Sequence, residues 1–152
     1  MVLRNFRVCD DKVYLASPFF NDAQRARERK ICAILREAGY DVYAPFEHGI
    51  VAKDCAPCEK EKAFKVNVAN IQKAAIVVAI TDEKDMGTVW EAGFAFAYGI
   101  PIVYYAETLG DNPFNIMLGF SGIGVFSNDT DFKKAAELHQ FTNNRGKVCE
   151  AE

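Results

Sequence analysis

Short apolar runs alternate with longer amphipathic stretches along the chain. The apolar runs cover residues 13–16, 41–43, 75–80, 101–105 and 123–126. The amphipathic stretches, with apolar residues three and four positions apart, cover residues 22–38, 60–73, 88–98 and 131–141. Strands that alternate with helices in this way build a parallel sheet with helices on both faces. The pattern therefore predicts an α/β fold with five parallel strands and about four helices.

Local signals refine these elements. Gly39 and Gly99 directly follow the first and third helical stretches, where a residue that tolerates positive φ ends a helix. Asp129 or Thr130 is expected to cap the last helix. The irregular stretch at residues 46–59 is the longest in the chain and is a candidate active-site loop.

Composition and charge limit the class of protein. The chain has 152 residues, half of them hydrophobic, which predicts a single domain over residues 1–152. A net charge of −3 argues against a nucleic-acid partner, because phosphate binding needs clustered lysine and arginine. The sequence has neither an apolar stretch long enough for a membrane span nor a signal-peptide core. We therefore expect a cytoplasmic protein that acts on small molecules and has no membrane partner.

The cysteines give little support for a metal. Five are present, an odd number, and free thiols are expected in a reducing compartment. Cys55 and Cys58 form a C-x-x-C pair near His48, a pattern that can indicate a metal or redox site. No second ligand pair follows at zinc spacing, so we predict neither a metal nor another cofactor. The remaining cysteines are Cys9, Cys32 and Cys149.

The candidate chemistry follows the predicted strands, because ligands of open α/β sheets bind beyond the carboxyl ends of the strands. The segments at that edge are residues 17–20, 45–48, 82–91 and 107–117, where acidic and aromatic residues dominate. Lysine and arginine are nearly absent from them, which does not suit a phosphate pocket.

The most informative segment surrounds Glu91. Gly87 allows a turn from loop into helix and Thr88 can cap that helix, which places Glu91 three residues beyond the cap. Glu91 then either closes a capping box or acts as a nucleophile that is held ionised near the helix N-terminus. This segment alone leaves both interpretations open.

Three motifs together resemble the nucleoside 2-deoxyribosyltransferase family. They are KVYLASPFF at residues 12–20, DMGTVWEAG at residues 85–93 and NIM at residues 115–117. The resemblance runs in order, with matching spacing, from about residue 12 to residue 126. It implies a three-layer sandwich of the flavodoxin-like or Rossmann-like type. The implied activity is that of a pentosyltransferase that moves 2-deoxyribose from a 2′-deoxynucleoside to a free nucleobase.

The resemblance also implies roles for individual residues. Glu91 would attack the anomeric carbon and form a covalent 2-deoxyribosyl ester, as in a retaining glycosidase. Tyr14 would orient Glu91 through its hydroxyl, and Asp85 would hold the sugar hydroxyl end. A core aromatic is the alternative for Tyr14, and an ordinary loop residue is the alternative for Asp85.

Further residues are implied to contact the substrate. Phe19 and Phe20 would form a wall of the base site, although ordinary packing of a strand end explains them nearly as well. Asn115 and Met117 would come from a neighbouring subunit and meet the 5′-hydroxyl, which predicts a homo-oligomer with shared active sites. The Asn-x-Met pattern also favours nucleosides over monophosphates, since related nucleotide N-glycosidases tend to have serine there. Gly87 completes this group of substrate-contacting residues.

The chain departs from the family at Asn67, where many members carry an aspartate that contacts the leaving base. An amide cannot deliver a proton at neutral pH, so base activation must come from elsewhere or be weaker. Glu47, His48 and Asp82 are possible substitutes, and Glu47 and Asp82 are included among the substrate-binding candidates. A polar tail at residues 146–152 also differs from the aromatic C-terminus of many members.

Three functions compete at this point. The first is deoxyribosyl transfer between bases, and the second is hydrolysis of a nucleoside or 5′-nucleotide with water as acceptor. The third is a catalytically silent nucleotide-binding sensor on the same fold. The presence of Glu91 favours an enzyme over the sensor.

Overall fold

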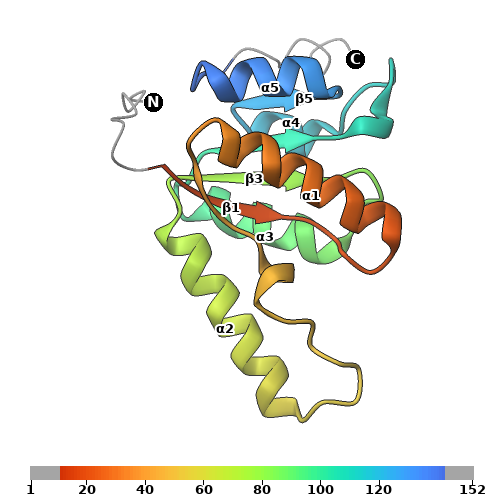
Figure 1. Cartoon of the computed structure of the whole chain (residues 1–152), viewed down its shortest axis with the longest axis vertical. Coiled ribbons are helices and arrows are strands. Elements are labelled where there is room, and N and C mark those ends of the chain that lie inside the picture. The colour runs from red at the N-terminus through yellow and green to blue at the C-terminus, as the bar shows by residue number, and fades with distance from the viewer. Residues whose placement is uncertain (1–10, 143–152) are drawn as a thin grey trace.

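The computed structural model describes residues 11–142 and contains one five-stranded sheet (Figure 1). Its strands are β1 (Lys12–Ala16), β2 (Asp41–Tyr43), β3 (Ile76–Ile80), β4 (Ile102–Tyr105) and β5 (Gly124–Phe126). The helices are α1 (Asp22–Glu37), α2 (Pro57–Lys73), α3 (Met86–Ala97), α4 (Ile116–Ser121) and α5 (Asp129–Glu137), with short 3-10 helices η1 (Pro45–His48) and η2 (Glu107–Leu109). Cys9, Cys149 and the tail at residues 146–152 lie outside the described residues.

The sheet confirms the predicted α/β fold. All four strand pairings are parallel, and the order is β2-β1-β3-β4-β5. This is the doubly wound order in which the chain starts near the middle of the sheet and later crosses to the other side. The crossover places the carboxyl ends of β1 and β3 side by side at one edge.

Two cores hold the three layers together (Figure 1). The face covered by α1 and α5 buries Ile31, Leu35 and Phe132. The opposite face, covered by α2, α3 and α4, buries Ile71 and Ala92. Side chains alternate between the two faces along each strand, so neighbouring residues of β1 enter different cores.

The helix ends test the local predictions. Gly39 and Gly99 adopt φ values of 96° and 76° just after α1 and α3, which confirms their assignment. The assignment of the last cap is wrong, because Asn128 caps α5 by accepting a hydrogen bond from the Asp131 amide at 2.8 Å. Asn128 precedes both predicted caps and has the extended backbone that an N-cap requires.

Two elements differ from the predicted pattern. Helix α2 begins at Pro57, three residues earlier than predicted, because proline suits the first helical position and Glu59 accepts a hydrogen bond from the Ala56 amide at 3.1 Å. Helix α4 was not predicted, since six residues are too few to show a helical period. The predicted loop at residues 46–59 is therefore shorter, and its irregular part spans residues 49–56. No helix within residues 11–142 is long and apolar enough to cross a membrane.

Candidate active site

The central feature of the site is a hydrogen bond between β1 and α3. The Tyr14 hydroxyl donates to Oε1 of Glu91 at 2.6 Å, across 77 positions of sequence. Tyr14 is completely buried and packs with the core between the sheet and α2 and α3. The fold thus brings together two residues that the sequence analysis assigned to one site.

The start of α3 corrects the local interpretation of Glu91. Asp85, not Thr88, is the N-cap, and its Oδ2 accepts hydrogen bonds from the Thr88 amide at 2.8 Å and from the Thr88 hydroxyl at 3.0 Å. Glu91 therefore lies in the second turn, beyond the reach of a capping box. A Cβ at Gly87 would lie 3.1 Å from Oδ2 of Asp85, so the glycine leaves room for this cap.

Burial sets the protonation of the Tyr14–Glu91 pair. It raises the pKa of Glu91 to about 7, the Tyr14 hydrogen bond opposes that rise, and the charge of Asp85 adds to it. Burial and the adjacent Glu91 charge also raise the pKa of Tyr14 well above its usual range. Tyr14 consequently remains a donor at any physiological pH, while Glu91 can be present as a carboxylate near neutrality.

An aromatic column extends from this pair to the edge of the sheet. The Tyr14 ring stacks on Tyr43 with centroids 5.7 Å apart, and Tyr43 stacks on His48 at 4.4 Å with only 8° between the planes. Burial, followed by the Glu91 charge, raises the pKa of the Tyr43 hydroxyl. Sequence reasoning missed Tyr43, although its parallel pairing with Tyr14 places both side chains on one face of the sheet.

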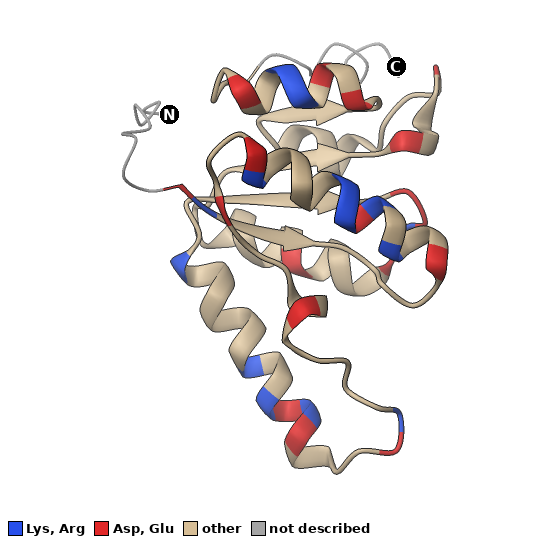
Figure 2. Ribbon diagram, in the orientation of Figure 1, with Lys and Arg blue, Asp and Glu red and all other residues tan. Residues whose placement is uncertain are grey.

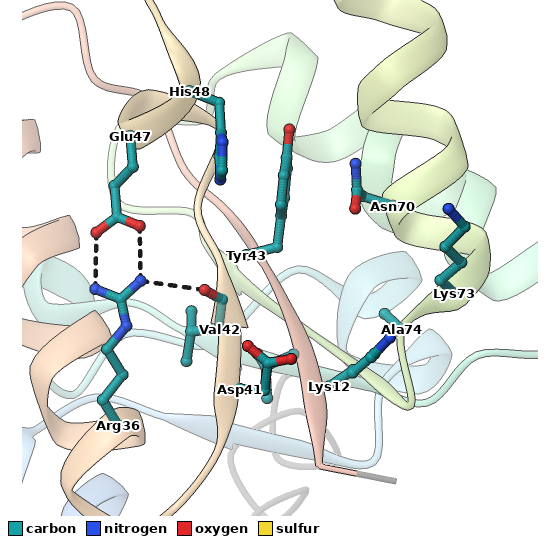
Figure 3. A pocket seen from close by; sticks show the side chains of 11 residues that line it. Lys12, Arg36, Asp41, Val42, Tyr43, Glu47, His48, Asn70, Lys73 and Ala74 are labelled. Carbon is teal, nitrogen blue, oxygen red and sulfur yellow. Dashed lines mark hydrogen bonds and ion pairs between the residues drawn. The ribbon is translucent and has the colours of Figure 1, made fainter.

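A cavity of about 320 Å³ runs beside the edge strand β2 (Figure 3). Tyr43 and His48 contribute to its lining and connect it to the aromatic column. Its lining also includes Lys12, Asp41, Asn70 and Lys73, so polar groups of both charges border it. Among residues 11–142, no three histidine, cysteine, aspartate or glutamate side chains gather as a metal site, and Cys55 and Cys58 are free thiols.

The two phenylalanines after β1 differ in exposure. Phe19 is half-buried against the ring of Phe46 from η1, with centroids 6.4 Å apart. Phe20 contacts Phe19 but is 71 % exposed, so its ring face is open to a ligand or another surface.

Two acidic candidates are held by basic side chains of α1. Glu47 forms a two-pronged ion pair with Arg36, at 2.7 and 2.6 Å, which holds the pKa of Glu47 below its usual range. Asp82 accepts a hydrogen bond from the Thr108 amide at 2.6 Å and lies 3.5 Å from Nε of Arg27. Neither contacts Tyr14 or Glu91.

The remaining candidates lie on α2 and α4. Asn67 is partly buried and shares the inward side of α2 with Asn70 and Ile71, which follow it by three and four residues. Asn115 caps α4 by accepting a hydrogen bond from the Leu118 amide at 3.1 Å. Met117 is 79 % exposed, so this pair faces outward in the single chain.

A family model described as nucleoside 2-deoxyribosyltransferase matches residues 13–144, which include Tyr14, Asp85 and Glu91. The chain belongs to the nucleoside 2-deoxyribosyltransferase family. The resemblance inferred from three motifs is thereby confirmed. No curated protein sequence matches the chain.

Solved structures agree with membership of the nucleoside 2-deoxyribosyltransferase family. A 2-deoxyribosyltransferase from Bacillus psychrosaccharolyticus is 29 % identical, with a TM-score of 0.71 over 80 % of this chain and 90 % of that one. A conserved protein from Enterococcus faecalis V583 is 21 % identical, with a TM-score of 0.71 over 84 % and 98 % of the two chains. A CMP N-glycosidase from Clostridium botulinum shares the fold at 17 % identity and a TM-score of 0.56, over 84 % and 98 %. Enzymes that act on N-glycosidic bonds are thus found among proteins of this fold.

Proposed function

We propose that the protein is a nucleoside 2-deoxyribosyltransferase that exchanges the base of a 2′-deoxynucleoside through an ester on Glu91. The observation that carries this proposal is the 2.6 Å hydrogen bond from Tyr14 to Glu91 at the carboxyl edge of the sheet. A partly buried carboxylate with one oriented oxygen suits attack on an anomeric carbon, because its second oxygen is left to form the new bond.

The reaction consists of two displacements. In the first, the free oxygen of ionised Glu91 attacks C1′ as the bond to the base breaks and its electron pair leaves with the base. In the second, a nitrogen of another base attacks C1′, and the Glu91 carboxylate is released. Two inversions restore the starting configuration, as in retaining glycosidases.

Asp85 has a free oxygen for the sugar. Its Oδ2 is occupied by Thr88, whereas Oδ1 has no hydrogen bond to any residue between 11 and 142. Oδ1 is therefore available to accept a hydrogen bond from a sugar hydroxyl while Oδ2 maintains the cap. This arrangement supports a substrate-holding role for Asp85 beside Glu91.

A homo-oligomer with shared active sites is part of the proposal. Helix α3 has one charged residue, Glu91, and α4 has none (Figure 2). Large apolar side chains on these two helices are nevertheless exposed, and contiguous exposed apolar surface marks interfaces. They are Met86, Val89, Trp90, Phe96, Ile116, Met117 and Phe120. A second copy against this surface would bring Asn115 and Met117 towards a neighbour's pocket.

Product analysis with and without an acceptor tests the function. The protein is incubated with 2′-deoxyadenosine alone and with 2′-deoxyadenosine plus free cytosine. Transfer predicts 2′-deoxycytidine in the second mixture and little free sugar. Free 2-deoxyribose at equal rates in both mixtures would instead establish a hydrolase that uses water as acceptor.

Light scattering tests the homo-oligomer with shared active sites. A protein that is a monomer in light scattering and is fully active would contradict it.

A further inference from the structure

The proposed reaction needs a proton at the leaving base, and this chain lacks the usual source. The position of the family aspartate is Asn67, whose amide cannot protonate a base at neutral pH. Protonation of the base is therefore either weaker in this chain or supplied by a different titratable group. The inference that follows rests on the proposed function.

Two of the acidic groups near the strand ends, Glu47 and Asp82, are unsuited to protonating the leaving base. Arg36 holds Glu47 as a carboxylate through two hydrogen bonds, so Glu47 has no proton to give near pH 7. One Asp82 oxygen accepts a hydrogen bond from the Thr108 amide of η2, the other lies 3.5 Å from Arg27 of α1, and the Asp82 side chain is only 1 % exposed. Glu47 is therefore held ionised, and burial closes Asp82 to a substrate base.

His48 has the required position and freedom. Its ring is exposed and stacks on Tyr43, which in turn stacks on Tyr14, the residue that binds Glu91. It also lines the cavity that Asn70 borders from α2, one helical turn from Asn67 (Figure 3). His48 thus shares a cavity with Asn70, which belongs to the same helix as the position of the family aspartate.

We infer that His48 is the general acid and base for the leaving and entering bases. In the first displacement the imidazolium gives its proton to a ring nitrogen of the departing base as the bond to C1′ breaks. In the second, the neutral imidazole takes a proton from the entering base as that base bonds to C1′. Each complete exchange returns His48 and Glu91 to their starting forms, so no further reactant is needed.

Titratable groups from five elements surround His48, and they include Lys12 of β1 and Arg36 of α1 at the same cavity. Glu47 belongs to the same short helix, and the charge of His48 helps to lower the pKa of Glu47. Tyr43 and Asp41 of β2 and Lys73 of α2 border the same cavity. The imidazole side chain of histidine donates a proton in its cationic form and accepts one in its neutral form, which are the two functions that the proposed steps require.

The test compares two leaving groups in wild-type protein and in the variant His48→Gln. The base of 2′-deoxyadenosine needs a proton to leave, whereas the base of 7-methyl-2′-deoxyguanosine is already cationic and leaves as a neutral molecule. We expect His48→Gln to lower kcat/KM for 2′-deoxyadenosine by about 10²-fold, at the lower end of general acid catalysis. Cleavage of the methylated substrate should change less than about 2-fold, since general acid catalysis does not contribute to it.

Two further variants sharpen the test. His139 is the other histidine of the chain and packs at a tilt against Tyr40, away from Tyr14 and Glu91, so His139→Gln should leave both rates unchanged. Adding Asn67→Asp to His48→Gln supplies a carboxyl group on α2 and should restore part of the lost rate with 2′-deoxyadenosine.

The possible results separate this inference from the proposed function. Equal loss with both substrates would make His48 a structural residue, and no loss with either would remove it from the reaction; each result overturns the inference alone. Wild-type protein that cleaves neither substrate would overturn the proposed function and the inference together. A selective loss with 2′-deoxyadenosine, partly restored by Asn67→Asp, supports both.

Discussion

Two glutamates on opposite faces of the sheet, the buried Glu28 and the partly buried Glu91, both have a raised pKa but differ in their surroundings. Burial raises the pKa of Glu91 on α3 and of Glu28 on α1 to about 7. Glu91 receives a hydrogen bond from Tyr14, whereas neither oxygen of Glu28 has a partner among residues 11–142. Glu28 is 1 % exposed and borders a separate cavity of about 210 Å³ beside Phe46.

The comparison shows that a raised pKa does not identify a nucleophile. Burial raises the pKa of any carboxyl group, and for Glu28 the neighbouring charge of Glu47 raises it further while Arg29 opposes this. Nothing orients the oxygens of Glu28 or stabilises its charged form by a hydrogen bond within residues 11–142. At Glu91, Tyr14 orients one oxygen and stabilises the charged form by a hydrogen bond. The hydrogen-bond partner, and not the pKa, therefore distinguishes the reactive carboxylate.

The largest expected effect comes from removing the Glu91 carboxylate. Glu91→Gln should lower kcat by at least about 10⁴-fold, because an amide cannot form the ester. The fold should persist, since the amide oxygen of the new side chain can still accept a hydrogen bond from Tyr14. Circular dichroism and thermal unfolding check the fold, and turnover of 2′-deoxyadenosine checks activity. A variant with wild-type turnover would remove Glu91 from the mechanism.

Removing the Tyr14 hydroxyl tests whether its hydrogen bond makes Glu91, and not Glu28, the reactive glutamate. Tyr14→Phe should lower kcat by about 10²-fold, a typical cost of losing one oriented donor. The Tyr14 bond lowers the pKa of Glu91, so its loss raises that pKa further above 7. Ionised Glu91 then becomes scarcer at low pH, and the acid limb of the kcat/KM profile should move to higher pH. An acid limb that stays in place would contradict this coupling.

A smaller effect is expected at Asp85. Asparagine is an equally good N-cap, so Asp85→Asn should change the free energy of unfolding by less than about 0.5 kcal/mol. Loss of a charged acceptor for the sugar should raise KM about 10-fold. Asp85 also raises the pKa of Glu91, so the acid limb should move slightly to lower pH. An unchanged KM would restrict Asp85 to capping α3.

The smallest effect on activity is expected at Glu28. Glu28→Gln should leave kcat within about 2-fold, because Glu28 has no contact with the Tyr14–Glu91 pair. Its effect is on stability instead. A folded-state pKa of about 7 lies above the unfolded value, so the folded wild type loses stability as pH rises from about 4.5 through 7. Glu28→Gln has no carboxyl group at this position, so its stability does not fall with pH for this reason.

Thermal unfolding at two pH values measures this effect. The Tm of Glu28→Gln relative to wild type should increase by several degrees, about 5 °C, between pH 5 and pH 8. The change with pH is informative even if the amide itself costs stability at both values. A constant difference in Tm would show that Glu28 does not titrate in this range.

Much of the fold could be predicted because it depends on local pattern. The continuous apolar run of β3 and the glycines after α1 and α3 are properties of a few adjacent residues. Helix α4 and the cap at Asn128 could not be predicted, since a short segment offers several polar residues and no period to choose between them. The buried Glu28 looks like an ordinary surface charge on an amphipathic helix, and only the packing of α1 on the sheet reveals its burial.

The site was less accessible to sequence reasoning. Tyr14 and Glu91 were joined through a family resemblance, and their contact depends on the parallel alignment of β1 and β3. The Thr88 cap was wrong because the helix begins three residues earlier, where the Asp85 side chain accepts a hydrogen bond from the Thr88 amide. Tyr43 carried no signal until strand pairing placed it beside Tyr14. The roles assigned to Phe19, Phe20, Asn67, Asn115 and Met117 remain predictions.

Covalent trapping tests most directly which glutamate is the nucleophile. A 2-fluoro-2′-deoxynucleoside slows release of the sugar, so the protein should gain the mass of one fluorinated sugar. Tandem mass spectrometry should place that mass on Glu91 in wild type and in Glu28→Gln, and Glu91→Gln should remain unlabelled. An adduct on Glu28 or on any other residue, or labelling of Glu91→Gln, would contradict the account.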